Sequence, residues 1–169
     1  MERQLTPNPT TTMEIHIRPA HPTEAAQLTR IAVAAKRHWG YSAALLQLWH
    51  NDLTITAAQI VRQPTYVAVV REVPVAVGML GAHPDGIELA HLWVRPDLIG
   101  RGIGRQLFTH LCQIARTAGF SQLFIEADPH AVGFYERMGA VQIGSVTTPH
   151  GRSLPLLRYE LPLAAAAGV

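Results

Sequence analysis

The most constraining feature of the chain is a glycine-rich segment that joins a strand-like run to an amphipathic run. Residues 98–110 read LIGRGIGRQLFTH, with glycine at positions 100, 102 and 104. The preceding run, IELAHLWV (87–94), is apolar and β-like, and apolar residues recur at helical spacing through 103–119. Glycine weakens regular structure, so its use here indicates that a bare backbone is needed. The segment therefore predicts a strand, a tight loop and a helix.

A second strand-like run follows this helix. QLFIEA (122–127) completes the order strand, loop, helix, strand. Because strands joined by a helical crossover lie parallel, we expect 87–94 and 122–127 to be parallel neighbours. The remaining expected elements are strands at 14–20, 65–70, 73–83, 141–147 and 154–161, and helices at 22–39, 43–50, after Thr56 and within 128–140. This order predicts a mixed α/β domain with more strands than helices.

Length and composition limit the class of protein. A chain of 169 residues, 48% hydrophobic, can form one core but is short for two. We expect a flexible leader at 1–12, a single domain at 13–163 and a tail at 164–169. The net charge of +2 and the absence of long basic runs argue against a nucleic-acid partner.

The sequence also predicts a cytoplasmic protein without a membrane partner. No apolar stretch approaches the roughly 20 residues that a membrane-spanning helix needs. The N-terminal residues lack the apolar region of a secretory signal. Cys112 is the single cysteine, which excludes an internal disulfide and fits a reducing compartment.

The glycine loop has the properties of a phosphate-binding cradle. A helix N-terminus presents unpaired N–H groups and roughly half a positive charge, and missing side chains let a ligand touch the backbone. Arg101 and Arg105 add mobile positive charge. The alternative is an ordinary turn, in which glycine serves only to allow a positive φ. A single turn does not require three alternating glycines, so the cradle is favoured. No lysine follows Gly104, which argues against a P-loop, and the spacing departs from the dinucleotide fingerprint.

Two motifs resemble a known family. VRPDLIGRGIGRQL resembles the loop with which the GNAT N-acetyltransferase superfamily binds the pyrophosphate of acyl-CoA. Gly102 and Gly104 match that loop, whereas Ile99 replaces the usual glutamine or arginine. ADPHAVGFYERMGA resembles a later segment of the same superfamily, in which Asp128 replaces the usual asparagine. The matching positions of this second motif are Ala131, Phe134, Tyr135 and Gly139.

The resemblance covers about residues 14–161 and implies both a fold and a donor. The fold is a mixed, mostly antiparallel central sheet of about six to seven strands flanked by helices, with one parallel strand–helix–strand unit. The donor is acetyl-CoA, and the acceptor is a primary amine, most simply a small molecule. The residues that the resemblance places at the cofactor are Leu92, Trp93, Val94, Ile99, Gly100, Arg101, Gly102, Ile103, Gly104, Arg105, Asp128, Phe134 and Tyr135. Late strands often pair between subunits in this superfamily, which allows a homodimer.

Direct acyl transfer to an amine needs a base. An alkylammonium titrates near pH ~10.4, so a group must remove its proton, directly or through a water. Glu88 occupies the position of the base in several superfamily members; its alternative is a solvated carboxylate at the start of a strand. His91 would titrate more suitably, but strand alternation directs it to the face opposite Glu88 unless a bulge intervenes.

The departing thiolate needs a proton or a hydrogen bond. Tyr135 matches the superfamily tyrosine in this role, and a phenol donates at neutral pH. The alternative for Tyr135 is simple aromatic packing beside Phe134. The resemblance further implies that a backbone N–H of Leu92–Val94 stabilises the thioester oxygen, and that the same amides pair with the pantetheine arm.

Other candidate residues are weaker. Cys112 lies beside the apolar stripe of its helix and is expected to be a small core residue. The nine histidines lack ligand-spaced pairs, so we expect no metal site. The segments 39–41 and 147–155 are candidates for the rim of an acceptor pocket.

Two other functions remain open on the sequence. A non-catalytic acyl-CoA sensor would keep the cradle but lack a productive acceptor site, and the departures at Ile99 and Asp128 support it best. A protein or peptide N-acetyltransferase would be favoured by an acidic or extended groove, but the sequence has no long acidic stretch.

Overall fold

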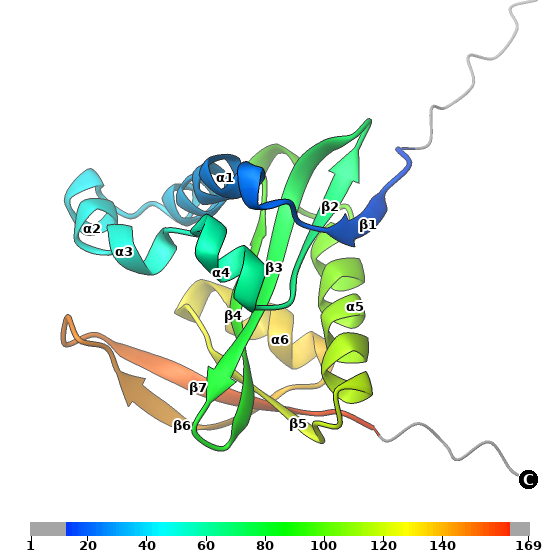
Figure 1. Ribbon diagram of the computed structural model, residues 1–169. Coiled ribbons are helices and arrows are strands. Elements are labelled where there is room, and N and C mark those ends of the chain that lie inside the picture. The colour runs from blue at the N-terminus through cyan, green and yellow to red at the C-terminus, as the bar shows by residue number, and fades with distance from the viewer. Residues whose placement is uncertain (1–12, 163–169) are drawn as a thin grey trace, which may run out of the picture.

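The computed structural model describes residues 13–162, which form one sheet with helices on both faces (Figure 1). The predicted leader and tail lie outside the described residues. The strands are β1 (His16–Pro19), β2 (Thr65–Val70), β3 (Val73–His83), β4 (Gly86–Val94), β5 (Gln122–Glu126), β6 (Val141–Thr147) and β7 (Ser153–Glu160). The α-helices are α1 (Ala25–His38), α2 (Ala43–Leu48), α3 (His50–Leu53), α4 (Ala57–Arg62), α5 (Ile103–Thr117) and α6 (Val132–Met138). Short 3₁₀ turns are η1 (Pro22–Glu24), η2 (Pro96–Leu98) and η3 (Pro129–Ala131).

The sheet confirms the predicted fold class. Its order is β1-β2-β3-β4-β5-β7-β6, and β4–β5 is the one parallel pair among the described strands. The predicted parallel unit is therefore β4–α5–β5. In Figure 1, α1–α4 lie on one side of β3 and α5 lies on the other.

Apolar faces of the helices hold the layers together. Leu107, Phe108 and Leu111 of α5 are fully buried against one face of the sheet. Leu28 and Ile31 of α1 pack against the other face. Burying a side chain of this kind contributes about 1.5–3 kcal/mol relative to exposure, and the two helical faces fix the sheet between them.

The parallel pair β4–β5 is very short. Its register contains only Ile87 opposite Leu123 and Glu88 opposite Phe124. Beyond Glu88 the two strands separate, while β4 continues to pair with β3 as far as Val94. The β5-facing edge of the later part of β4 therefore has no strand beside it within residues 13–162.

A β-bulge changes which face of β4 carries each side chain. The register with β3 shifts between Met79, opposite His91, and Leu80, opposite Leu89, so Ala90 is an extra residue. Glu88 and His91 consequently line the same cavity, although they stand three positions apart in the strand. Strand alternation predicted that His91 faces away from Glu88 unless a bulge intervened, and this bulge is that exception.

Gly78 of β3 marks where α5 lies closest to the sheet. A Cβ atom at Gly78 would lie 2.4 Å from Leu111 Cδ1 and 3.3 Å from Leu107 Cγ. We expect Gly78→Ala to lower the free energy of unfolding by about 1–3 kcal/mol, because both leucines are fully buried and have little room to move. Urea unfolding measures this difference.

Gly144→Ala in β6 is the matched control, since a Cβ atom there meets nothing within 4 Å. It should change the free energy of unfolding by no more than about 0.5 kcal/mol. Equal stability of the two variants would show that the packing of α5 against β3 tolerates an added methyl group.

Candidate active site

The glycine loop presents a run of free backbone amides. Gly100 and Gly102 have φ of 81° and 79°, a left-handed conformation that other residues adopt at a cost. Gly102 precedes the first turn of α5 and supplies no side-chain cap. The first intrahelical bond runs from Gln106 N to Gly102 O at 3.1 Å, and no residue within 13–162 accepts from the N–H groups of 100–105. These amides are therefore available as hydrogen-bond donors to an anion.

A cavity of about 440 Å³ lies beside this loop, between β4 and α6; we call it the loop cavity. Its lining includes most of the predicted cofactor residues: Leu92, Trp93, Val94, Ile99, Gly100, Gly102, Ile103, Gly104, Arg105, Phe134 and Tyr135. Arg101 and Asp128 are not among the lining residues. The structure thus gathers one segment from each of the two motifs around a single space.

Tyr135 is both a core residue and a wall of the loop cavity. It is 7% exposed, and its ring lies 5.9 Å from that of Phe108 and 5.2 Å from that of Phe134. Burial raises the pKa of the Tyr135 phenol, so the hydroxyl remains protonated around neutral pH. No residue of the described chain forms a hydrogen bond with this hydroxyl. Packing and proton donation are therefore compatible at this position.

A second cavity of about 500 Å³ lies on the other side of Trp93, which lines both; we call it the sheet cavity. Its lining includes residues of α1, α3, β4 and the β6–β7 hairpin. In Figure 1 this is the region between α2–α3 and the β6–β7 hairpin. The segment 147–155, predicted as a rim, contributes Thr147, Thr148, Pro149, Arg152 and Leu154.

Glu88 lies half-buried at the base of the sheet cavity. Burial raises the pKa of its carboxyl group, and the negative charge of Glu126 raises it further, while His83 opposes the shift. A carboxylate with a raised pKa is a stronger base than a solvated one. These surroundings distinguish Glu88 from a freely solvated carboxylate at a strand start.

His91 shares the sheet cavity but is a poor base. It is 7% exposed, and burial lowers its pKa to about 4. Its Nδ1 accepts a hydrogen bond from Trp93 Nε1 at 3.0 Å, which leaves the proton of the neutral ring on Nε2. The expectation that His91 titrates more suitably than a carboxylate was wrong, because the imidazole is desolvated.

Asp128 is the centre of a charged group that the sequence did not predict. Its carboxylate accepts hydrogen bonds from Lys36 Nζ at 2.5 Å, from Arg152 Nη2 at 3.0 Å, from Tyr41 Oη at 3.0 Å and from the backbone N–H of His130 at 2.9 Å. We call these five residues the Asp128 cluster. Through the contact with His130 N, Asp128 also caps the η3 turn that precedes α6.

The Asp128 cluster is largely buried. Burial alone would raise the pKa of Asp128, but hydrogen bonds from Lys36 and His130 lower it below the ordinary value. The ammonium group of Lys36 lies 5.0–5.9 Å from the ring centroids of four aromatic residues. These are Trp39, Tyr41, Trp49 and Trp93. Asp128 lines the sheet cavity, so its predicted contact with a cofactor stays a prediction.

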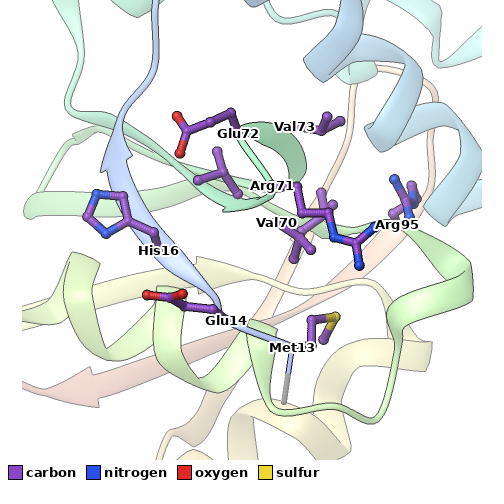
Figure 2. Close-up of a pocket in the computed structure, with 10 residues that line it drawn as sticks. Met13, Glu14, His16, Val70, Arg71, Glu72, Val73 and Arg95 are labelled. Atoms are coloured by element: carbon purple, nitrogen blue, oxygen red, sulfur yellow. The ribbon is translucent and has the colours of Figure 1, made fainter. Parts of the chain in front are cut away.

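A third cavity, about 910 Å³ and larger than the other two, lies elsewhere, between β1 and the β2–β3 turn (Figure 2). Glu14, His16, Arg71, Glu72 and Arg95 supply its polar lining. It contains none of the predicted site residues. Cys112 lies outside all three cavities, packs against the core, and has its pKa raised to about 12 by burial, which suits a structural residue.

Comparison with known proteins establishes the family. The model of the acetyltransferase (GNAT) family matches residues 29–140. The chain therefore belongs to the GNAT acetyltransferase family, as the two motifs predicted. No helix within the described ranges is long and apolar enough to cross a membrane.

Individual relatives agree with this assignment. The peptidyl-lysine N-acetyltransferase YjaB of Salmonella typhimurium is 35% identical over 102 residues, which span 59% of this chain and 66% of that protein. A GCN5-related N-acetyltransferase from Rhodopseudomonas palustris has a TM-score of 0.74 at 27% identity, covering 89% of this chain and 98% of that one. PaiA N-acetyltransferase from Thermoplasma acidophilum, solved with coenzyme A, gives 0.73 at 17% identity over 88% and 99% of the two chains, which supports the fold alone.

Removing the charge of Asp128 should destabilise the fold. We expect Asp128→Ala to lower the free energy of unfolding by about 3–5 kcal/mol, because Lys36 would remain buried without its counter-charge. Chemical denaturation measures the loss. Asp97→Ala, which breaks the exposed Arg95–Asp97 pair, is the control and should leave the midpoint almost unchanged. A similarly small effect of Asp128→Ala would show that water readily reaches Lys36.

Proposed function

We propose that this protein transfers the acetyl group of acetyl-CoA to a primary amine by direct attack, with Glu88 as general base and Tyr135 as general acid. One observation carries the proposal. The free amides of the glycine loop and the carboxylate of Glu88 lie in two cavities that meet at Trp93. A donor held on one side can therefore meet an acceptor held on the other.

The loop cavity fits the donor. The amides of residues 100–105 and the side chain of Arg105 suit a diphosphate, since both offer positive potential without needing a metal. Along β4, the edge that β5 leaves uncovered suits the amide-containing arm of coenzyme A, which can pair like a strand. A backbone N–H of Leu92–Val94 on this edge would stabilise the thioester oxygen as negative charge develops. The donor supplies an activated acetyl carbon.

The sheet cavity fits the acceptor. Glu88 accepts the proton of the ammonium group, directly or through a water, so that the amine can attack the acetyl carbon. The C–N bond forms as the C–S bond breaks. Tyr135 donates its phenolic proton to the departing sulfur and regains one from solvent. Glu88 and Tyr135 thus handle the two protons of the reaction on opposite sides of β4.

The acceptor is, in this proposal, a small-molecule amine. A second candidate is a lysine side chain of a protein, which the name of the Salmonella relative favours. Leu45 and Leu48 of α2, the helix that precedes the cavity-lining Trp49, are 37% and 50% exposed and would offer apolar contacts to a peptide. A sensor without catalysis would bind acetyl-CoA but release no thiol with any amine.

The role of Glu88 predicts a pH dependence. Only the carboxylate can accept a proton, so kcat/KM should fall as the pH drops through the raised pKa of Glu88, above the ordinary value of about 4.3. Glu88→Gln should remove this acidic limb and lower kcat by about 10²–10⁴-fold. Thiol release from acetyl-CoA across pH measures both effects.

Glu126→Gln is the matched control for this profile. The charge of Glu126 raises the pKa of Glu88, so its removal should move the acidic limb to lower pH without abolishing turnover. An acidic limb that persists unchanged in Glu88→Gln would mean that another group is the base.

The role of Tyr135 predicts a separate loss in turnover. Tyr135→Phe should lower kcat on the order of 10²-fold, because no phenol remains to protonate the sulfur, while the Kd for coenzyme A changes little. Tyr159→Phe is the control, since Tyr159 also contacts the Phe108 ring, at 5.2 Å, but lines neither cavity. Equal turnover of wild type and Tyr135→Phe would remove Tyr135 from the mechanism.

A further inference from the structure

The sheet cavity is lined by both carboxylates and cations. Glu88 and Glu126 line it, and the negative charge of Glu126 adds to burial in raising the pKa of Glu88. Lys36 and Arg152 also line it, and both pair with the carboxylate of Asp128, while Asp52 lines the same cavity and its negative charge acts on Lys36. Within residues 13–162, no ion pair joins Arg152 to either glutamate. Among the described residues, the carboxylate that pairs with Arg152 is therefore shared with Lys36.

Arg152 is the cation that a ligand can reach. The side chain of Lys36 is 9% exposed and enclosed by aromatic rings, whereas that of Arg152 is 22% exposed and lines the cavity. The buried Lys36 thus neutralises the charge of Asp128. As a result, Arg152 keeps positive charge that its partner Asp128 does not fully compensate.

The guanidinium group of Arg152 is held in a fixed orientation. Its Cζ lies 4.6 Å from the ring centroid of Trp49 and 5.0 Å from that of Tyr41. Nη2 donates to Asp128 Oδ2 at 3.0 Å and also to Tyr41 Oη. Among the described residues, none accepts from Nε or Nη1. A planar guanidinium with free N–H groups is suited to a carboxylate, and holding it in place lowers the entropy lost on binding.

We propose that the acceptor amine also carries a carboxylate, as in an amino acid or another aminocarboxylic acid, and that Arg152 binds this carboxylate. The ammonium end lies toward Glu88 and Glu126, and the anionic end lies toward Arg152. This inference rests on the proposed acetyl transfer and adds the substrate class. An internal lysine of a protein has no carboxylate of its own to place at Arg152.

A panel of matched acceptors tests the proposal. Glycine, β-alanine, 4-aminobutyrate and L-lysine are compared with their carboxamides, together with a lysine peptide blocked at both ends, by thiol release from acetyl-CoA. For each aminocarboxylic acid that is acetylated, we expect kcat/KM to be about 10- to 100-fold higher than for the matching carboxamide. This is the effect of one hydrogen-bonded charge pair.

Variants of Arg152 separate substrate binding from a structural role. Arg152→Gln should bring the acid-to-amide ratio near one by raising KM for the acid, and Arg152→Lys should retain part of the preference through its charge. A purely structural role would lower both activities together and leave the ratio unchanged. Arg62→Gln, an exposed change at the end of α4, is the control and should match wild type.

The outcomes distinguish this inference from the proposed function. Thiol release with the amides or the blocked peptide, but not with the acids, would overturn the proposal that the acceptor carries a carboxylate. It would leave the proposed acetyl transfer in place. An unchanged ratio in Arg152→Gln that remains folded by thermal unfolding would also overturn it. The absence of thiol release with every acceptor would overturn both.

Discussion

The separation of β4 from β5 after Glu88 is the constraint on which the rest of the site depends. If the two parallel strands stayed paired, the backbone amides of β4 would form hydrogen bonds with β5 and would not be open to a ligand. Because the register ends at Glu88 and Phe124, the later part of β4 keeps one open edge, and α6 lies across the gap with Phe134 and Tyr135. The glycine loop then follows β4 directly, so the open edge and the free helix amides belong to one continuous path. A long, thin ligand with a diphosphate at one end matches that path.

The bulge at Ala90 determines the second part of the site, the sheet cavity. Without it, Glu88 and His91 would lie on opposite faces of β4, and the cavity around Glu88 would lose one wall. With it, Leu92 and Val94 pack toward the α5 core while Trp93 packs toward α1. Trp93 thereby separates the loop cavity from the sheet cavity and lines both. One irregular residue in the strand thus determines where the two cavities meet.

What the sequence could predict followed from local patterns. The apolar periodicity located α5, the runs 87–94 and 122–127 located the parallel pair, and the glycines located the cradle, since each signal lies within a few neighbouring residues. The bulge was not predictable in the same way, because a one-residue shift in pairing depends on the partner strand. The pKa of His91 also escaped prediction, since burial and not residue type lowers it to about 4.

The Asp128 cluster shows the same limit of prediction from local patterns, here for residues that lie far apart in the sequence. Lys36 and Tyr41, Asp128, and Arg152 come from three separate parts of the chain. Tyr41 and Arg152 lie in segments that the sequence identified as candidate rims, but no spacing rule joins them to Lys36. Asp128 itself was predicted from its motif, yet with a cofactor as its partner. The fold adds contacts of Asp128 with Lys36, Tyr41 and Arg152 that no local pattern predicts, and its contact with a cofactor stays a prediction.

The cluster also explains why a buried ion pair is tolerated at this point. Two buried charges cost several kcal/mol of desolvation, which their attraction offsets only with good geometry, so an apolar group of similar volume would often be as stable. An apolar group could not, however, fix the orientation of its neighbours. Asp128 holds Arg152 at the sheet cavity. It also contacts His130, whose ring stacks on Trp39 at 5.4 Å, and both of these residues line the loop cavity. A single carboxylate therefore orders side chains in both cavities, and this positioning, more than net stability, accounts for a charge in a buried place.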